Sequence, residues 1–331
     1  MKKQMRMTVV TAVTAVWLGA AIPVSAWAAQ LIPVGTAVGI EVDVDGVLVE
    51  KLCEVETDDG TVQPAKAAGL KEGDIILAID GEEVDDLEDF AEELRERKGE
   101  TLTLTVMRQG KTFTCELTPV QSKEGEYRLG LWLRDKVAGI GTVTYYDPKS
   151  GEYGALGHGI NDPESGTLIP ITHGKTFDAS VVDVVQGKSG DPGELTGSFD
   201  TGAVFGTVAG NTVYGIFGKC GNVSCGDVME TAAQGEVKVG EAQILSTVDG
   251  TEPQLYDIRI DKIRRSGGEE RYQLTVTDPD LLAITGGVVC CMSGSPILQN
   301  GKLVGAVTHV LVNDPTRGYG IFIENMLNAA G

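Results

Sequence analysis

The chain has 331 residues, 42% hydrophobic and 23% charged, which is enough for two folded domains or three small ones. Its 48 acidic residues outnumber its 27 basic residues and give a net charge of -21. Such a surface repels phosphate backbones, so the composition argues against nucleic-acid binding. The 44 glycines favour short strands and tight turns over long helices.

The first thirty residues have the composition of a secretory leader. A basic start precedes an apolar run from Thr8 to Val24, and Ala26-Trp27-Ala28 forms a cleavage site of the small-x-small type. A retained membrane anchor is the alternative, because the apolar run approaches the length that spans a bilayer. The sequence therefore predicts export across the cytoplasmic membrane, with residues 1–30 as signal peptide or N-terminal anchor.

Six cysteines in an exported chain raise the question of disulfides. Cys220 and Cys225 lie in a glycine-rich turn and could pair locally, whereas Cys290 and Cys291 are adjacent and cannot easily bridge each other. The remaining two, in the first half of the chain, are Cys53 and Cys115. Buried free thiols are the simpler alternative. Zinc-ligand spacing is absent, and we expect neither a metal nor another cofactor.

Residues 34–120 form one predicted small domain. Strands are expected over residues 38–44, 46–49 and 74–79. A helix follows a cap at Asp85 or Asp86; its acidic start and basic end suit the helix dipole, and Gly99 ends it. A hairpin over residues 102–117 then completes the domain.

One motif in this segment is specific. The run Ala67-Ala68-Gly69-Leu70-Lys71-Glu72-Gly73-Asp74-Ile75-Ile76, followed by Ile79-Asp80-Gly81, resembles the PDZ domains of bacterial proteases. The resemblance implies a groove in which a peptide C-terminus or an internal segment adds as a strand to a sheet edge. It also implies that the carboxylate-holding loop falls at Val38, Gly39 and Ile40. A structural domain that binds no peptide is the alternative.

The rest of the chain is predicted to be almost entirely β. Residues 121–135 form a linker and a first strand, which spans Tyr127 to Leu133. Short strands and glycine-marked turns fill residues 136–331, and no helix is expected before the segment from Ile323 to Ala330. This pattern favours a sandwich or a pair of barrels.

The chain contains three histidines, and they differ in context. His158 lies between Gly157 and Gly159 at the end of a predicted strand, where space around the imidazole suits a general base. His173 follows a strand, and its role is undecided. His309 lies inside an apolar predicted strand, where a structural histidine is the expected reading.

Ser293 is the candidate nucleophile. It lies in Cys291-Met292-Ser293-Gly294-Ser295-Pro296, after a glycine-rich approach and before a hairpin that turns at Asn300-Gly301. A serine on a tight loop beside a rigid hairpin can have backbone N–H groups turned toward a developing oxyanion. Ser-Gly-Ser also occurs in loops without function, so the local pattern alone leaves a structural role open.

A longer resemblance supports the catalytic reading. The sequence from Met292 to Val310 is similar to the stage IV sporulation protein B peptidases of endospore-forming bacteria. The match continues in three further runs, Tyr145–Pro148 leading to Gly157–Gly159, Asn313–Thr316 and Gly318–Ile321. The resemblance implies a mostly β chain: a PDZ-like α+β domain followed by a chymotrypsin-like double β-barrel with a serine triad.

The family assigns each role to a residue of this chain. Its base falls on His158, its nucleophile on Ser293 and its acid on Asp278, in the chain order of chymotrypsin. Asp280 and Asp162 are alternative acids.

By analogy with the chymotrypsin loop, the oxyanion donors are the N–H groups of Cys291 and Ser293. The family usually has glycine where this chain has Cys291, and a side chain there is costly if φ is positive. Because no charged residue lies beside Gly286-Gly287, a pocket that selects basic residues is not expected.

The resemblance implies an exported serine endopeptidase that cleaves itself and a few signalling proteins. It would act in the intermembrane space between forespore and mother cell, free or membrane-anchored. There it would cut a regulator of a membrane protease and so activate a mother-cell sigma factor. Two alternatives remain: an inactive peptidase fold that acts as an adaptor through its PDZ groove, and a Cys–His peptidase that uses Cys290 or Cys291.

Overall fold

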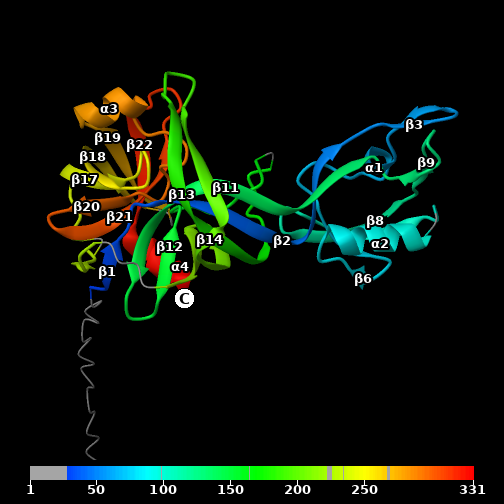
Figure 1. Ribbon diagram of the computed structural model, residues 1–331, viewed down its shortest axis with the longest axis horizontal. Helices are drawn as coiled ribbons and strands as arrows, with labels where there is room; N and C mark the ends of the chain where they lie inside the picture. The colour runs from blue at the N-terminus through cyan, green and yellow to red at the C-terminus, as the bar shows by residue number, and fades with distance from the viewer. Residues whose placement is uncertain (1–27, 98, 164, 222–225, 234, 267–268) are drawn as a thin grey trace, which may run out of the picture.

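The computed structural model describes residues 28–331 except 98, 164, 222–225, 234, 267 and 268. The predicted leader falls almost wholly outside the described residues, although Gln30, placed in it by the sequence analysis, already begins a strand. Within the described part, no helix has both the length and the apolar character needed to cross a bilayer. Two β-barrels lie at one end of the molecule and an α+β domain lies at the other (Figure 1).

The first barrel is a ring of six antiparallel strands. In ring order they are β2 (Ala37–Leu52), β11 (Leu131–Asp147), β12 (Glu152–Ala155), β15 (Gly215–Cys220), β14 (Glu194–Thr212) and β13 (Ile171–Val185). The ring closes because β2 pairs with both β11 and β13. Two short strands, β1 (Gln30–Pro33) and β16 (Met229–Glu230), extend the sheet from β11. Alternate residues such as Val38, Ile40 and Val42 fill the interior.

The second barrel is also closed by six strands. In ring order they are β17 (Gly240–Ser246), β18 (Gln254–Ser266), β19 (Glu269–Val276), β22 (Arg317–Phe322), β21 (Lys302–Val310) and β20 (Pro296–Gln299). Helix α4 (Ile323–Ala330) follows β22, as predicted. Helix α3 (Pro279–Thr285) was not predicted, because the surrounding sequence has the pattern of short strands and turns. Asp278 caps this helix and proline occupies its first turn.

The α+β domain has the predicted helix and hairpin. Its elements are β3 (Val55–Thr57), β4 (Gly60–Val62), α1 (Pro64–Ala67), β5 (Ile75–Ile79), β6 (Glu82–Glu83), α2 (Leu87–Arg97), β7 (Leu102–Arg108), β8 (Lys111–Leu117), β9 (Val120–Gln121) and β10 (Tyr127–Arg128). Asp74 of the PDZ-like motif is fully buried, and its carboxylate accepts two hydrogen bonds from Arg108 at 2.6 and 2.7 Å. That paired charge fixes the motif to β7.

The α+β domain is inserted into the first barrel rather than placed before it. Strands β2 and β11 each run from the barrel into the domain, where Leu131 pairs with Leu52 (Figure 1). Residues 37–44, predicted to belong to the PDZ-like domain, therefore pair within the first barrel. Strand β2 carries buried residues along both its barrel and its domain half, so its pattern does not mark where it changes domain. The buried residues of β11 all lie in its barrel half, from Gly141 to Tyr146.

Candidate active site

Ser293 lies on a short loop between α3 and β20, at the junction of the two barrels. The loop is held by hydrogen bonds from both barrels. The Thr142 N–H of β11 donates to the Ser293 carbonyl at 3.1 Å, and the Gly294 N–H donates to the Val307 carbonyl of β21 at 2.8 Å. A Cβ on Gly294 would collide with the Thr142 carbonyl oxygen, so only glycine allows this close approach.

From Cys290 to Ser295, two N–H groups have no internal acceptor among the described residues, those of Cys291 and Ser293. The N–H between them, that of Met292, donates to the Val289 carbonyl at 3.2 Å. The Met292 carbonyl accepts from both the Ser295 N–H and the Ser295 hydroxyl. This alternation leaves the two donors available for an oxyanion, as the family-based assignment requires.

Cys291 adopts φ 75°, in the left-handed region that favours glycine. The concern raised by the sequence, that a side chain stands where the family has glycine, therefore corresponds to real backbone strain. Leu156, two residues before His158, is likewise at φ 71°. The three other described non-glycine residues with positive φ are Asp80, Gln109 and Asn300, each of which stands beside a glycine in a turn. Strain of this kind is characteristic of functional sites.

We expect Cys291→Gly to increase the free energy of unfolding by about 1 kcal/mol, because glycine removes most of the left-handed penalty. Urea denaturation measures this change. Cys290→Gly is the matched control: Cys290 is not in the positive-φ region, so glycine there should only add unfolded-state entropy and destabilise the fold. A destabilised Cys291→Gly variant would contradict the strain argument.

His158 follows β12 in the first barrel, and its segment contacts the nucleophile loop directly. A Cβ on Gly294 would lie 2.6 Å from the Leu156 nitrogen, and one on Gly157 would lie 3.2 Å from the Thr308 methyl carbon of β21. The catalytic base and the nucleophile predicted from sequence are thus brought to one junction, with a residue from each barrel.

The imidazole of His158 is oriented by the backbone. Its Nδ1 lies 2.8 Å from the Gly159 carbonyl oxygen, which can only accept, so Nδ1 carries the proton and Nε2 keeps its lone pair. That is the tautomer a general base needs. Burial lowers the pKa of His158, and the bond to Gly159 raises it in part.

His309 corrects the sequence-based reading. It was predicted to be a structural histidine, but the residue keeps part of its surface in solvent, and its partly covered ring lies with its centroid 5.0 Å from that of His158, at an interplanar angle of 35°. Burial, His158 and Arg271 together lower the pKa of His309 to about 4. His173 is exposed on β13, where its Nε2 lies 3.0 Å from Asp43.

Asp278, the predicted acid, serves as a helix cap in this structure. Its carboxylate accepts from the N–H groups of Asp257, Asp280 and Leu281 at 3.0–3.1 Å. Burial acts to raise the pKa of Asp278, but these donors outweigh it and the net shift is downward. Among the described residues it has no hydrogen bond to His158, so the Gly159 carbonyl takes the place that the resemblance gave to Asp278.

We expect Asp278→Asn to retain peptidase activity within about threefold, since asparagine caps a helix as well as aspartate does. Asp278→Ala should lower the free energy of unfolding by about 1 kcal/mol. The measurements are kcat on a cleaved peptide and a denaturation midpoint. A loss of about 10⁴-fold in Asp278→Asn would restore the acid role, because that substitution has such an effect in a serine triad.

The alternative acids are also engaged elsewhere. Asp162 is buried, and its carboxylate accepts from the Ser165 N–H at 2.8 Å and lies against Gly73 of the PDZ-like motif. Asp280 is exposed in the first turn of α3. The side chain that holds the loop after His158 is Asn211, which bonds both the Ile160 N–H and the Ile160 carbonyl at 2.8 Å. Sequence reasoning missed it.

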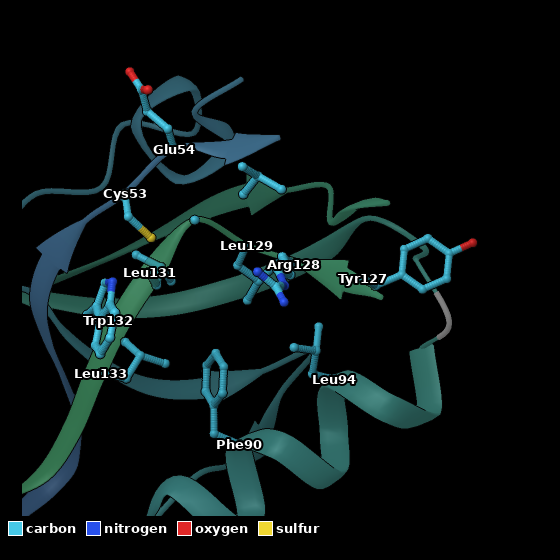
Figure 2. A pocket seen from close by; sticks show the side chains of 12 residues that line it. Cys53, Glu54, Phe90, Leu94, Tyr127, Arg128, Leu129, Leu131, Trp132 and Leu133 are labelled. Atoms are coloured by element: carbon cyan, nitrogen blue, oxygen red, sulfur yellow. The ribbon is translucent and has the colours of Figure 1, made fainter. Parts of the chain in front are cut away.

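The α+β domain contains an apolar groove of about 410 Å³, which we call the peptide groove. Phe90 and Leu94 of α2 point from the helix toward the segment that ends β10 and begins β11 (Figure 2). Leu131 and Leu133 pair with β2 along one edge, and their other edge has no partner strand among the described residues. Gly130, at φ 72°, precedes them. An added peptide strand fits this geometry.

The predicted PDZ loop at Val38, Gly39 and Ile40 was wrong. These residues lie in the barrel half of β2, paired on both edges with β11 and β13, so they offer no free edge to a peptide. Glycine occurs at position 39 for packing, since a Cβ there would collide with the ring of Phe199. The same pattern of a glycine between two apolar residues occurs at Leu129-Gly130-Leu131. This segment follows the domain in sequence, where the prediction placed a linker.

The cysteine thiols are poorly suited to nucleophilic chemistry. Among described residues, no group of three or more His, Cys, Asp or Glu side chains could hold a metal ion. Burial raises the pKa of Cys291 to about 11 and also raises the pKa of Cys290. Both thiols therefore stay protonated near neutral pH and are poor nucleophiles. The proposed Cys220–Cys225 pair involves a residue outside the described chain.

Comparison with known proteins connects this geometry to two families. The model of the family described as SpoIVB peptidase S55 matches residues 125–327, and the model of the PDZ domain matches residues 39–118. The first match covers more than half of the chain and includes both His158 and Ser293.

Matches to individual proteins are partial. The chain is 36% identical over 89 residues to LL2128 of Lactococcus lactis subsp. lactis, which is named as a zinc metalloprotease. That match covers 27% of this chain and 20% of the relative. Zinc metalloprotease RasP of Shouchella clausii is 34% identical over 71 residues, which are 21% of this chain and 17% of RasP. The chain thus spans about a fifth of the length of these relatives.

Among solved structures, the active form of the Rv3671c protease from M. tuberculosis aligns with a TM-score of 0.34 and 15% identity. The alignment covers 59% of this chain and 75% of that one.

Proposed function

Because this chain belongs to the SpoIVB peptidase S55 family and is a serine peptidase, we propose that it is an exported endopeptidase that cleaves itself and a small set of signalling proteins. Ser293 is the nucleophile and His158 the base. The observation that carries this proposal is the junction itself. The loop in which the Cys291 and Ser293 N–H groups have no internal acceptor lies against the segment that leads to His158, whose Nδ1–H is held by a carbonyl.

The proposed reaction follows from these contacts. The Nε2 of His158 takes the proton of Ser293 as Oγ attacks the scissile carbonyl, and the imidazolium then protonates the leaving amine. The N–H groups of Cys291 and Ser293 stabilise the oxyanion, and each such donor is typically worth about 10²–10³-fold in rate. The Gly159 carbonyl keeps the base in the required tautomer.

The proposed substrates are proteins delivered through the peptide groove. The groove is apolar, and its exposed strand edge suits either a peptide C-terminus or an internal extended segment. By family membership, the chain acts in the space between forespore and mother cell, free or anchored. There it cuts a regulator of a membrane protease and so activates a mother-cell sigma factor.

A purified chain of residues 29–331 tests the catalytic proposal. Incubation with a fluorophosphonate probe should give one adduct, mapped to Ser293 by mass spectrometry, together with self-cleavage fragments. An adaptor would give neither adduct nor fragments while still binding peptides. A Cys–His peptidase would be inactivated by iodoacetamide and resist the fluorophosphonate.

Two further measurements test the cellular part of the proposal. Intact mass of the exported protein separates cleavage after Ala28 from retention of the leader. A sigma-factor reporter in sporulating cells should stay silent when Ser293 is alanine.

A further inference from the structure

Among the described residues, Thr142 on β11 is the first-barrel residue whose side chain donates a hydrogen bond to the nucleophile loop. This threonine is 1% exposed. Its hydroxyl donates to the Cys291 carbonyl at 3.0 Å, and its N–H donates to the Ser293 carbonyl at 3.1 Å. Its own carbonyl accepts from the Leu156 N–H at 3.1 Å, in the segment that leads to His158. One residue thus bonds both segments that carry the candidate catalytic side chains.

These contacts fix the orientation of the backbone peptide units in the nucleophile loop. Each peptide unit is planar, so a bond to its carbonyl also fixes the direction of its N–H and limits rotation of the neighbouring units. The units that follow Cys291 and Ser293 are the two that Thr142 holds, and they flank the free Ser293 N–H. The Cys290 and Met292 carbonyls are held by the Leu195 N–H and by Ser295.

The strain at Cys291 makes this restraint necessary. A residue at φ 75° gains free energy by turning the peptide unit before it out of the left-handed region. The carbonyl of that unit, on Cys290, accepts from the Leu195 N–H at 3.2 Å, and the Thr142 hydroxyl holds the unit after Cys291, so the strained residue is held on both sides. The donor of the bond from the Thr142 hydroxyl is buried, since Thr142 is 1% exposed, whereas Cys291, which supplies the carbonyl, is half-buried.

We propose that Thr142 is a positioning residue, whose hydroxyl keeps the strained loop in the conformation that presents the Cys291 and Ser293 N–H groups to the oxyanion. The inference rests on the proposed peptidase function. Thr142 is not proposed to contact the substrate; it acts by holding the loop. Nothing in the sequence pattern marks it, because threonine is an ordinary strand residue.

The chain offers a matched control two residues away. Thr144 is on the same strand and fully buried, but its hydroxyl has no hydrogen-bond partner in the described structure. Threonine-to-valine replacement at either position preserves shape and removes one hydroxyl. The two variants therefore differ only in whether the lost hydroxyl held the nucleophile loop.

The test compares Thr142→Val, Thr142→Ser and Thr144→Val by kcat and KM on a cleaved peptide. We expect Thr142→Val to lose about 10-fold or more in kcat with KM nearly unchanged, the cost of one buried hydrogen bond to the loop. Thr142→Ser keeps the hydroxyl and should stay within about threefold of wild type, as should Thr144→Val. Should Thr142→Val not fold, Thr142→Ala takes its place.

Amide hydrogen exchange gives a readout that does not depend on activity. In Thr142→Val, the N–H groups of Met292 and Gly294 should exchange faster than in Thr144→Val, because the loop that orients them is released. If wild type shows no Ser293-dependent cleavage, the proposed function fails while the exchange comparison still decides the role of Thr142. Equal kcat and equal exchange in the two valine variants would overturn the positioning role.

Discussion

Ser293→Ala is expected to reduce peptide-bond cleavage by about 10⁶-fold, because the loss of a triad serine typically removes that much of kcat. The residue is the one described side chain at the barrel junction that combines a hydroxyl with two adjacent free N–H groups. Cleavage of a peptide substrate by the purified variant, followed by mass spectrometry, measures the effect. Self-cleavage should disappear in parallel.

Ser295 supplies the matched control for this prediction. It lies two residues further in the same Ser-Gly-Ser motif, but it is fully buried and its hydroxyl bonds the Met292 carbonyl at 2.7 Å and the Ser246 hydroxyl at 2.9 Å. Ser295→Ala should cost about 10-fold in kcat through loop geometry. Cleavage that persists in Ser293→Ala and is lost in Cys290→Ser would assign the nucleophile to a thiol instead.

The segments predicted best from sequence are those with local signals. The helix after Asp86, the hairpin of residues 102–117 and the final helix have caps, turns and periodicity that belong to a few consecutive residues. Ser293 and His158 likewise lie in long motifs shared with one family. The two barrels and the α+β domain confirm the predicted fold class.

The structure differs from the prediction at residues whose contacts depend on the fold. Gly39 fits a PDZ loop by its local pattern, yet the ring of Phe199, which lies 160 positions later, explains it. His309 lies in an apolar strand, and only the fold brings its ring against His158. Asp278 has the right spacing before Ser293, but the next seven residues form a helix that uses its carboxylate as a cap. For Gly39 and His309 the distant partner leaves no local signal, whereas the Asp278 cap has one, the proline that follows it at the start of α3.

The insertion of the α+β domain connects the peptide groove to the catalytic junction through one strand. The first residues of β11 form the groove edge, and Thr142, later in the same strand, holds the nucleophile loop. The segment after His158 also packs on the domain, since Ile169 joins Leu48 and Ile75 in one apolar cluster. The position of the groove is therefore fixed relative to both catalytic segments by continuous backbone and by packing.

His158→Ala is expected to reduce kcat by about 10⁵–10⁶-fold, because the general base and the nucleophile act as a unit. In the wild type, kcat/KM should fall as the pH is lowered, since a protonated imidazole cannot take the proton of Ser293. Burial lowers the pKa of His158 below its ordinary 6.5, so half-maximal activity should lie below that pH.

The folded state disfavours the charged imidazole of His158, so the free energy of unfolding should decrease at low pH, as the activity does. An unfolded chain binds the proton of His158 at a higher pH than the native chain does, so the free energy of unfolding decreases as pH falls below 6.5. A pH series of kcat/KM with parallel denaturation measures both. His173→Ala is the control, because that exposed side chain lies on β13 and should leave the acid limb unchanged. An acid limb centred above pH 7 would mean that a carboxylate, and not the Gly159 carbonyl, faces Nδ1 in the working enzyme.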